Sequence, residues 1–177
     1  MLFADDIECA LRAAVELVNS AEPPDTLTEI AQLDAFFVKF AYTGVHAGDA
    51  EELAAVRALR PPLRRMLTGD RDTAVRLVNE TLAANRALPQ LVRHDDLDYH
   101  IHAVPAAAPL AVRIAVETAM AMVDLIRADE LSRLSICADK SCEGIVFDSS
   151  RNRSRRYCST ACGNRNAVAA YRARMKS

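Results

Sequence analysis

The chain has 177 residues, of which 51% are hydrophobic but only 5% are aromatic, and it contains no tryptophan. This length allows one domain of ordinary size plus a small module, and a core built from Ala, Leu and Val favours helices. No stretch reaches the roughly 20 apolar residues of a membrane span, and the acidic N-terminus is unlike a secretory signal, so we expect a cytoplasmic protein.

Charge is divided unequally along the chain. Residues 1–131 hold 12 Lys and Arg against 21 Asp and Glu, a net charge of −9. Residues 132–177 hold 10 basic and 3 acidic residues, a net charge of +7. A separation of this size suggests that the C-terminal part binds a polyanion.

The first 60 residues have the pattern of amphipathic helices. Apolar residues at helical spacing predict a first helix that ends near Ser20. A second helix should begin at a cap formed by Thr26 or Thr28 and close near Gly44. A third should begin at Asp49 and continue to about residue 59.

Prolines and glycines then mark where the next predicted helices end or begin. Pro61-Pro62 either divides the third helix or starts another, because proline is well tolerated in the first turn. Gly69-Asp70 precedes a further amphipathic helix over residues 74–83. Residues 88–93 and 98–104 predict a short β-hairpin, and a last helix over 107–131 is apolar nearly all round, so it should be central.

Four of the five cysteines lie in the last 41 residues, in two closely spaced pairs. Zn²⁺ takes four thiolates tetrahedrally at about 2.3 Å, so two short-spaced pairs satisfy it and leave no position open for water. The pattern therefore predicts one structural zinc ion, with iron as the alternative metal and two disulfides as the alternative chemistry. The expected ligands are Cys137, Cys142, Cys158 and Cys162. Cys9 stands apart, as a small buried residue.

Around the cysteines the sequence predicts a compact zinc module. Residues 144–147 favour a strand, 148–150 a turn, and Ser159 or Thr160 can cap a helix that runs to Arg174, with one face able to pack and another presenting cations. The expected fold class is mainly α: a multi-helical N-terminal domain with a short β-hairpin, residues 1–131, and a C-terminal zinc-finger module of knuckle, β-hairpin and helix, residues 132–177.

The cations of this module are candidate contacts to DNA. Arginines placed near phosphates gain affinity through counterion release, and they can read guanine edges in the major groove. The candidate residues are Arg151, Arg153, Arg155, Arg156, Arg165, Arg172, Arg174 and Lys176. A solvated charged tail, or a patch docked on the acidic body of the same chain, is the plainer alternative.

The segment Cys158-Ser159-Thr160-Ala161-Cys162-Gly163-Asn164-Arg165, with Tyr171-Arg172-Ala173-Arg174 after it, closely resembles the CGNR zinc finger. In that family the finger follows a helical ABATE domain, described as a putative stress-induced transcription regulator of bacteria. The N-terminal resemblance rests on Leu17-Val18-Asn19-Ser20 and Leu77-Val78-Asn79. Tyr157 stands where the family often has Trp, and Ala167 where Lys is common. The resemblance implies the same four zinc ligands and binding to DNA.

Three functions follow from these observations. We expect a DNA-binding transcription regulator, not an enzyme, whose helical domain senses a small-molecule effector or forms a homodimer. A zinc-dependent adaptor that docks an acidic protein partner is the runner-up. An enzyme would have to use the polar residues of the predicted hairpin, which are His94, Asp95, Asp96, Asp98, His100 and His102. Asn19, Asn79 and His102 are candidate ligand contacts, although each asparagine can equally tie a helix end.

Overall fold

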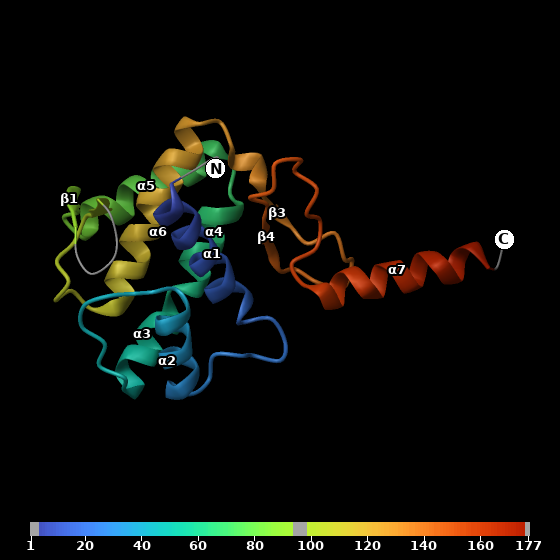
Figure 1. Cartoon of the computed structure of the whole chain (residues 1–177), viewed down its shortest axis with the longest axis horizontal. Helices are drawn as coiled ribbons and strands as arrows, with labels where there is room; N and C mark the ends of the chain where they lie inside the picture. The colour runs from blue at the N-terminus through green and yellow to red at the C-terminus, as the bar shows by residue number, and fades with distance from the viewer. Residues whose placement is uncertain (1–3, 94–98, 176–177) are drawn as a thin grey trace.

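A computed structural model describes residues 4–93 and 99–175. We call residues 4–131 the helical body and residues 132–175 the C-terminal module, whose last helix projects away from the body (Figure 1). In chain order the elements are α1 (Asp5–Asn19), α2 (Ile30–Lys39), α3 (Ala50–Ala58), α4 (Arg60–Thr68), α5 (Arg71–Ala84), β1 (Gln90–Val92), β2 (His100–His102), α6 (Leu110–Arg127), the 3₁₀ turn η1 (Leu131–Arg133), β3 (Leu134–Ile136), β4 (Ile145–Phe147) and α7 (Thr160–Arg174). No described helix meets the length and apolarity needed to cross a membrane.

Local capping explains where most of the helices begin. The carboxylate of Asp49 accepts a hydrogen bond from the backbone N–H of Glu52 at 2.8 Å, which starts α3. Asp70 accepts one from Thr73 at 2.8 Å and starts α5, and prolines occupy the first turn of α4. Each cap satisfies an amide that has no partner inside the helix. The predicted helices in these places are confirmed.

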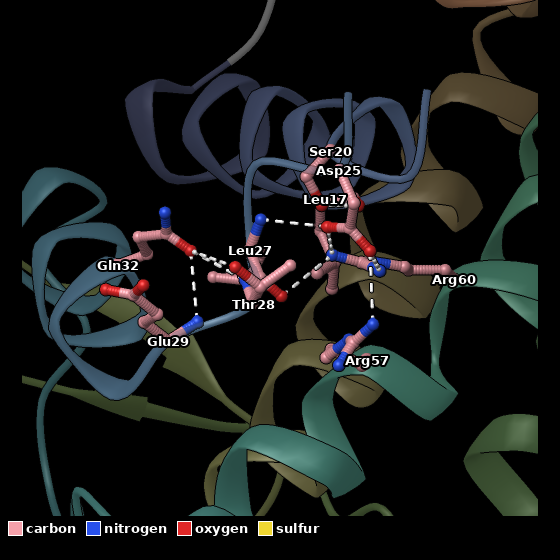
Figure 2. A network of polar contacts seen from close by, with 9 residues as sticks. All are labelled: Leu17, Ser20, Asp25, Leu27, Thr28, Glu29, Gln32, Arg57 and Arg60. Carbon is pink, nitrogen blue, oxygen red and sulfur yellow. Dashed lines mark hydrogen bonds and ion pairs between the residues drawn. The ribbon is translucent and has the colours of Figure 1, made fainter. Parts of the chain in front are cut away.

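The start of α2 differs from the prediction. Neither threonine caps the helix; Glu29 is the N-cap residue, and the side-chain oxygen of Gln32 accepts hydrogen bonds from the N–H groups of Thr28 and Glu29 (Figure 2). The Gln32 side chain, in the first turn, thus accepts hydrogen bonds from amides that have no partner inside the helix, and the helix begins later than predicted. It also ends at Lys39, earlier than the predicted Gly44.

The loop before α2 is tied to α4 by a buried arginine. Arg60 donates to both carboxylate oxygens of Asp25 at 2.9 Å, Arg57 adds a third bond at 3.1 Å, and the N–H of Leu27 a fourth at 2.9 Å (Figure 2). The hydrogen bonds from Arg60 are the main reason that the pKa of Asp25 falls to about 2. The charged network therefore fixes a loop that has no regular structure of its own.

Helix α6 lies at the centre of the body, as predicted. It packs against α1, α3 and α5, and Figure 1 shows it running through the body among them. Leu110, Ile114, Met122 and Leu125 are fully buried. An apolar surface on several sides of one helix is stable only when other helices cover it, which explains the central position.

The hairpin of the body forms in the predicted place. Strand β1 pairs antiparallel with β2, with Leu91 opposite Ile101. Its predicted turn, which contains His94, Asp95 and Asp96, and the neighbouring Asp98 lie outside the described residues.

The hairpin of the C-terminal module has a partner strand that was not predicted. Strand β4 pairs antiparallel with β3, with Ser135 opposite Val146, so the first cysteine pair lies in the hairpin turn. The arginine-rich segment 151–156 is consequently an irregular loop after β4, not a hairpin loop. Ile145 and Phe147 pack into the core of the body. The division between residues 131 and 132 remains a prediction, and across it the apolar core is continuous.

Candidate metal centre

Four cysteines reach one point from two loops. Cys137 follows β3, where its N–H donates to the carbonyl of Gly144 at 2.8 Å, and Cys142 lies in the turn before β4. Cys158 precedes α7, and Cys162 lies in its first turn. The hydroxyl of Ser159 accepts from the N–H of Cys162 at 3.3 Å and so caps the helix that carries this ligand.

The sulfur positions fit one tetrahedral ion. All four Sγ atoms lie within 4.8 Å of one another, with 3.5 Å between Cys142 and Cys158 and 3.7 Å between Cys158 and Cys162. Four thiolates at about 2.3 Å from a zinc ion would have sulfurs about 3.8 Å apart. None of the described cysteines forms a disulfide. The cluster is therefore a site for one structural zinc ion.

Gly144 leaves room for the sulfurs. A Cβ at this position would come within 2.9 Å of the Cys158 Sγ and 3.3 Å of the Cys142 Sγ. Its backbone N–H donates to the Cys142 sulfur at 3.3 Å, and the N–H of Cys158 donates to the Cys137 sulfur at 3.4 Å. Such bonds orient thiolates and offset their charge, so Gly144, which precedes β4, supports the ligands.

Arg165 acts on the cluster itself. Its guanidinium donates to the Cys162 sulfur at 3.0 Å and to the carboxylate of Asp139 at 2.8 Å. The backbone and hydroxyl of Ser141 donate to that carboxylate and lower the pKa of Asp139 to about 2, so it is ionised at neutral pH. Arg165 was predicted from its charge to contact DNA, which stays a prediction; in the structure its side chain joins the knuckle to α7.

The other predicted DNA contacts fall into two groups. Arg153 donates to Glu130 at 2.7 Å, and Arg155 donates to the carbonyl oxygens of Tyr157 and Cys158, so both are engaged with the protein. The other predicted DNA contacts that the structure describes are all exposed: Arg151, Arg156, Arg172 and Arg174. Among the described residues, the side chains of the first three have no ion-pair partner. Lys176 lies outside the described residues.

Helix α7 has an uncovered apolar stripe. Val168 is 48% exposed, Tyr171 58% and Met175 71%. The sequence predicted that this face can pack, but no part of the described chain covers it, because α7 points away from the body (Figure 1). The described residues therefore leave this stripe accessible to solvent.

Asn19 connects the body to the metal module. Its side-chain amide donates to the carbonyl of Ile145 at 2.8 Å and accepts from the N–H of the same residue at 2.6 Å. Arg12 adds a bond to Ser149 at 2.9 Å, and Arg64 one to the carbonyl of Glu143 at 2.6 Å. The Asn19 side chain therefore pairs with both backbone polar groups of Ile145, the first residue of β4.

Replacing Asn19 with alanine should lower the free energy of unfolding of the zinc-loaded chain by about 2 kcal/mol. Both hydrogen-bonding groups of a buried strand residue would lose their partner, and each such loss costs roughly 1 kcal/mol. Urea unfolding measures the change. Asn79→Ala, at an exposed position on α5, is the matched control and should change stability by less than about 0.5 kcal/mol. Equal effects of the two substitutions would contradict the role of Asn19.

The three predicted ligand contacts do not come together. Asn19 lines a hollow beside the metal module, Asn79 lies on the outer side of α5, and His102 lines a larger cavity in the body. The rings of His100 and His102 meet with 3.0 Å between their Nε2 atoms. Sequence reasoning had no signal for the larger cavity, because its walls come from three separate stretches of the chain.

Comparisons with known proteins match both parts of the chain. The model of the family described as CGNR zinc finger matches residues 133–175, which include all four cysteines of the cluster. The model of the ABATE family, described as a putative stress-induced transcription regulator, matches residues 11–129. No curated protein matches the chain.

Proposed function

Because this chain belongs to the ABATE family of putative stress-induced transcription regulators and carries a CGNR zinc finger, we propose that it regulates transcription by binding DNA through the C-terminal module. The observation that carries the proposal is the concentration of exposed arginines that have no ion-pair partner among the described residues, Arg151, Arg156 and Arg172, on a part of the chain whose net charge is +7. The family description names a regulator and not an enzyme.

The shape of the module supports this proposal. Helix α7 has 15 residues, so it is about 22 Å long, and a helix of about 10–12 Å diameter fits the major groove. Arg172 is on this helix, whereas Arg151 and Arg156 are in the loop between β4 and Cys158. The helix would enter the groove while the loop contacts the phosphates on either side of it.

Affinity measured across a salt series tests the proposal. The zinc-loaded chain should bind duplex DNA with an affinity that falls steeply as salt rises. The triple variant Arg151→Gln, Arg156→Gln, Arg172→Gln should bind on the order of a hundredfold more weakly near 0.1 M salt, and its logarithmic salt slope should be smaller by about 2.7. Fluorescence anisotropy with a labelled duplex gives both quantities.

A body arginine provides the control for this experiment. Arg76 is also exposed but pairs with Glu80 on α5, so Arg76→Gln should leave both the affinity and the salt slope unchanged. No binding at low salt, or an unchanged slope in the triple variant, would exclude DNA binding through these arginines.

The apolar stripe of α7 favours a second candidate function. Val168, Tyr171 and Met175 are exposed beside Arg172, a combination that fits an acidic protein surface with an apolar centre. Under this candidate the chain is a zinc-dependent adaptor. Failure to bind DNA, with the zinc site intact, would favour it over the regulator.

The helical body is proposed to sense an effector or to dimerise. Regulators that bind paired half-sites are commonly two-fold symmetric, and a homodimer would place two C-terminal modules on one stretch of DNA. The net charge of −9 on residues 1–131 argues that the body itself stays away from the phosphates.

A further inference from the structure

A cavity of about 780 Å³ opens in the helical body, far along the chain from the cysteine cluster. Its walls come from three stretches of the chain: residues 43–44, residues 85–92, which follow α5 and include β1, and residues 102–106, which begin at the end of β2. Sites for small molecules in proteins occupy about 300–1,000 Å³, so the cavity is large enough for a metabolite-sized ligand.

One wall of the cavity is fixed by a buried arginine. Arg113 is 3% exposed; its guanidinium donates to the carbonyl of Val45 and, at 3.1 Å, to that of Ala108. Gly44, which precedes Val45, has φ +88°, and a Cβ there would come within 2.3 Å of the carbonyl oxygen of Ala106. The wall is therefore held in place without a ligand, as expected of a formed binding site.

The cavity favours a negative charge. Arg86 lines it with an exposed side chain, and among the described residues its guanidinium has no hydrogen-bond or ion-pair partner. The Nη1 of Arg113 also has no hydrogen-bond partner in the described chain, and a Cβ at the lining residue Gly44 would come within 2.9 Å of it. None of the described lining residues is Asp or Glu. An anion would supply the partner that the Arg86 guanidinium lacks.

The remaining lining residues fit the rest of such a ligand. An apolar surface is formed by Leu88, Val92, Val104 and Pro105. Leu88 is 72% exposed. Thr43, Asn85, Gln90 and His102 add polar groups among them. Apolar walls with a few polar groups and one charge are typical of sites that bind small organic molecules.

We propose that this cavity binds a small organic acid, with its carboxylate paired to Arg86 and its hydrocarbon part against Leu88, Val92 and Val104. The proposal rests on the sensing role proposed for the body, and it names the chemical class of the effector. Its site is separate from the DNA-binding arginines, so the ligand can be measured without DNA.

Binding of simple acids to the full-length, zinc-loaded chain tests this proposal. The probes are hexanoate and benzoate, and their uncharged controls are hexanamide and benzamide, which have nearly the same shape. Ligand-observed NMR titration gives each dissociation constant. At least one acid should bind, and the matching amide should bind about tenfold more weakly or not at all, because the charge-assisted bond to Arg86 is lost.

Three variants locate the site. Arg86→Gln should weaken binding of the acid about tenfold. Arg76→Gln, on α5 and outside the cavity, should leave the binding of the acid unchanged. Leu88→Asp places a carboxylate at an already exposed position and should also weaken binding. Acids that do not bind at millimolar concentration, or that bind Arg86→Gln as tightly as the unaltered chain, would overturn the proposal. Loss of DNA binding alone would leave it standing.

Discussion

Stripping the metal from the zinc-loaded chain should unfold residues 134–174 and also destabilise the helical body. One ion shared by four thiolates holds the hairpin turn against the first turn of α7, and zinc contributes about 10–16 kcal/mol to small fingers of this kind. Ile145 and Phe147 are buried in the core of the body. Their exposure would remove roughly 3–6 kcal/mol of stability from it, at the usual value for fully buried large apolar side chains.

Circular dichroism and amide hydrogen exchange, before and after chelation, measure both effects. Helix α7 should lose its signal, and amides of α1 that face β4 should exchange faster. Cys158→Ser should reproduce the chelated state. Cys9→Ser is the control, because its thiol bonds the carbonyl of Phe40 away from the cluster, and it should retain one zinc per chain. Unchanged exchange in α1 after chelation would mean that the body does not depend on the module.

Replacing Arg133 with alanine should destabilise the chain by about 3–5 kcal/mol, the cost typical of breaking a buried ion pair. Its side chain is 2% exposed and donates to Glu130 at 2.8 Å and to the carbonyls of Asp148 and Ser150 at 2.9 and 3.0 Å. These bonds join the end of the body to the loop after β4. Without the guanidinium, two buried carbonyl groups would lose their donor.

Arg153 provides a matched control for this prediction. It donates to the same carboxylate of Glu130 at 2.7 Å, but its side chain is 50% exposed. Water therefore screens this ion pair, and Arg153→Ala should cost less than about 1 kcal/mol. Urea unfolding of both variants in excess zinc separates the two cases. Equal losses would show that burial of Arg133 does not set its contribution.

Much of the fold is predictable because its signals are local. An aspartate before an apolar periodic run, as at Asp49 and Asp70, marks a helix start whatever the rest of the chain does. The cysteine cluster is similarly readable, because zinc imposes a ligand number and the spacing of each pair lets one loop supply two ligands.

The features that escaped prediction depend on contacts between distant segments. Strand β3 has three residues, too few to show an alternating pattern, so its pairing with β4 carried no sequence signal. Charge alone did not separate Arg133, which is buried, from Arg151, which is exposed. Asn19 was recognised as polar at a helix end, but its partner lies 126 residues away. Such roles arise only when the tertiary structure brings the partners together.

Because α7 projects away from the body, its own stability affects how tightly this chain can bind a partner. Isolated helices of about 12–15 residues are marginal in water, because forming the first turn is costly. In α7 the Ser159 cap and the metal ligand Cys162 supply that turn, so the ion serves as the nucleus of the helix. We expect the distal turns to exchange between helix and coil until a partner covers them. Part of the binding free energy would then be spent on ordering, which favours fast release over long residence.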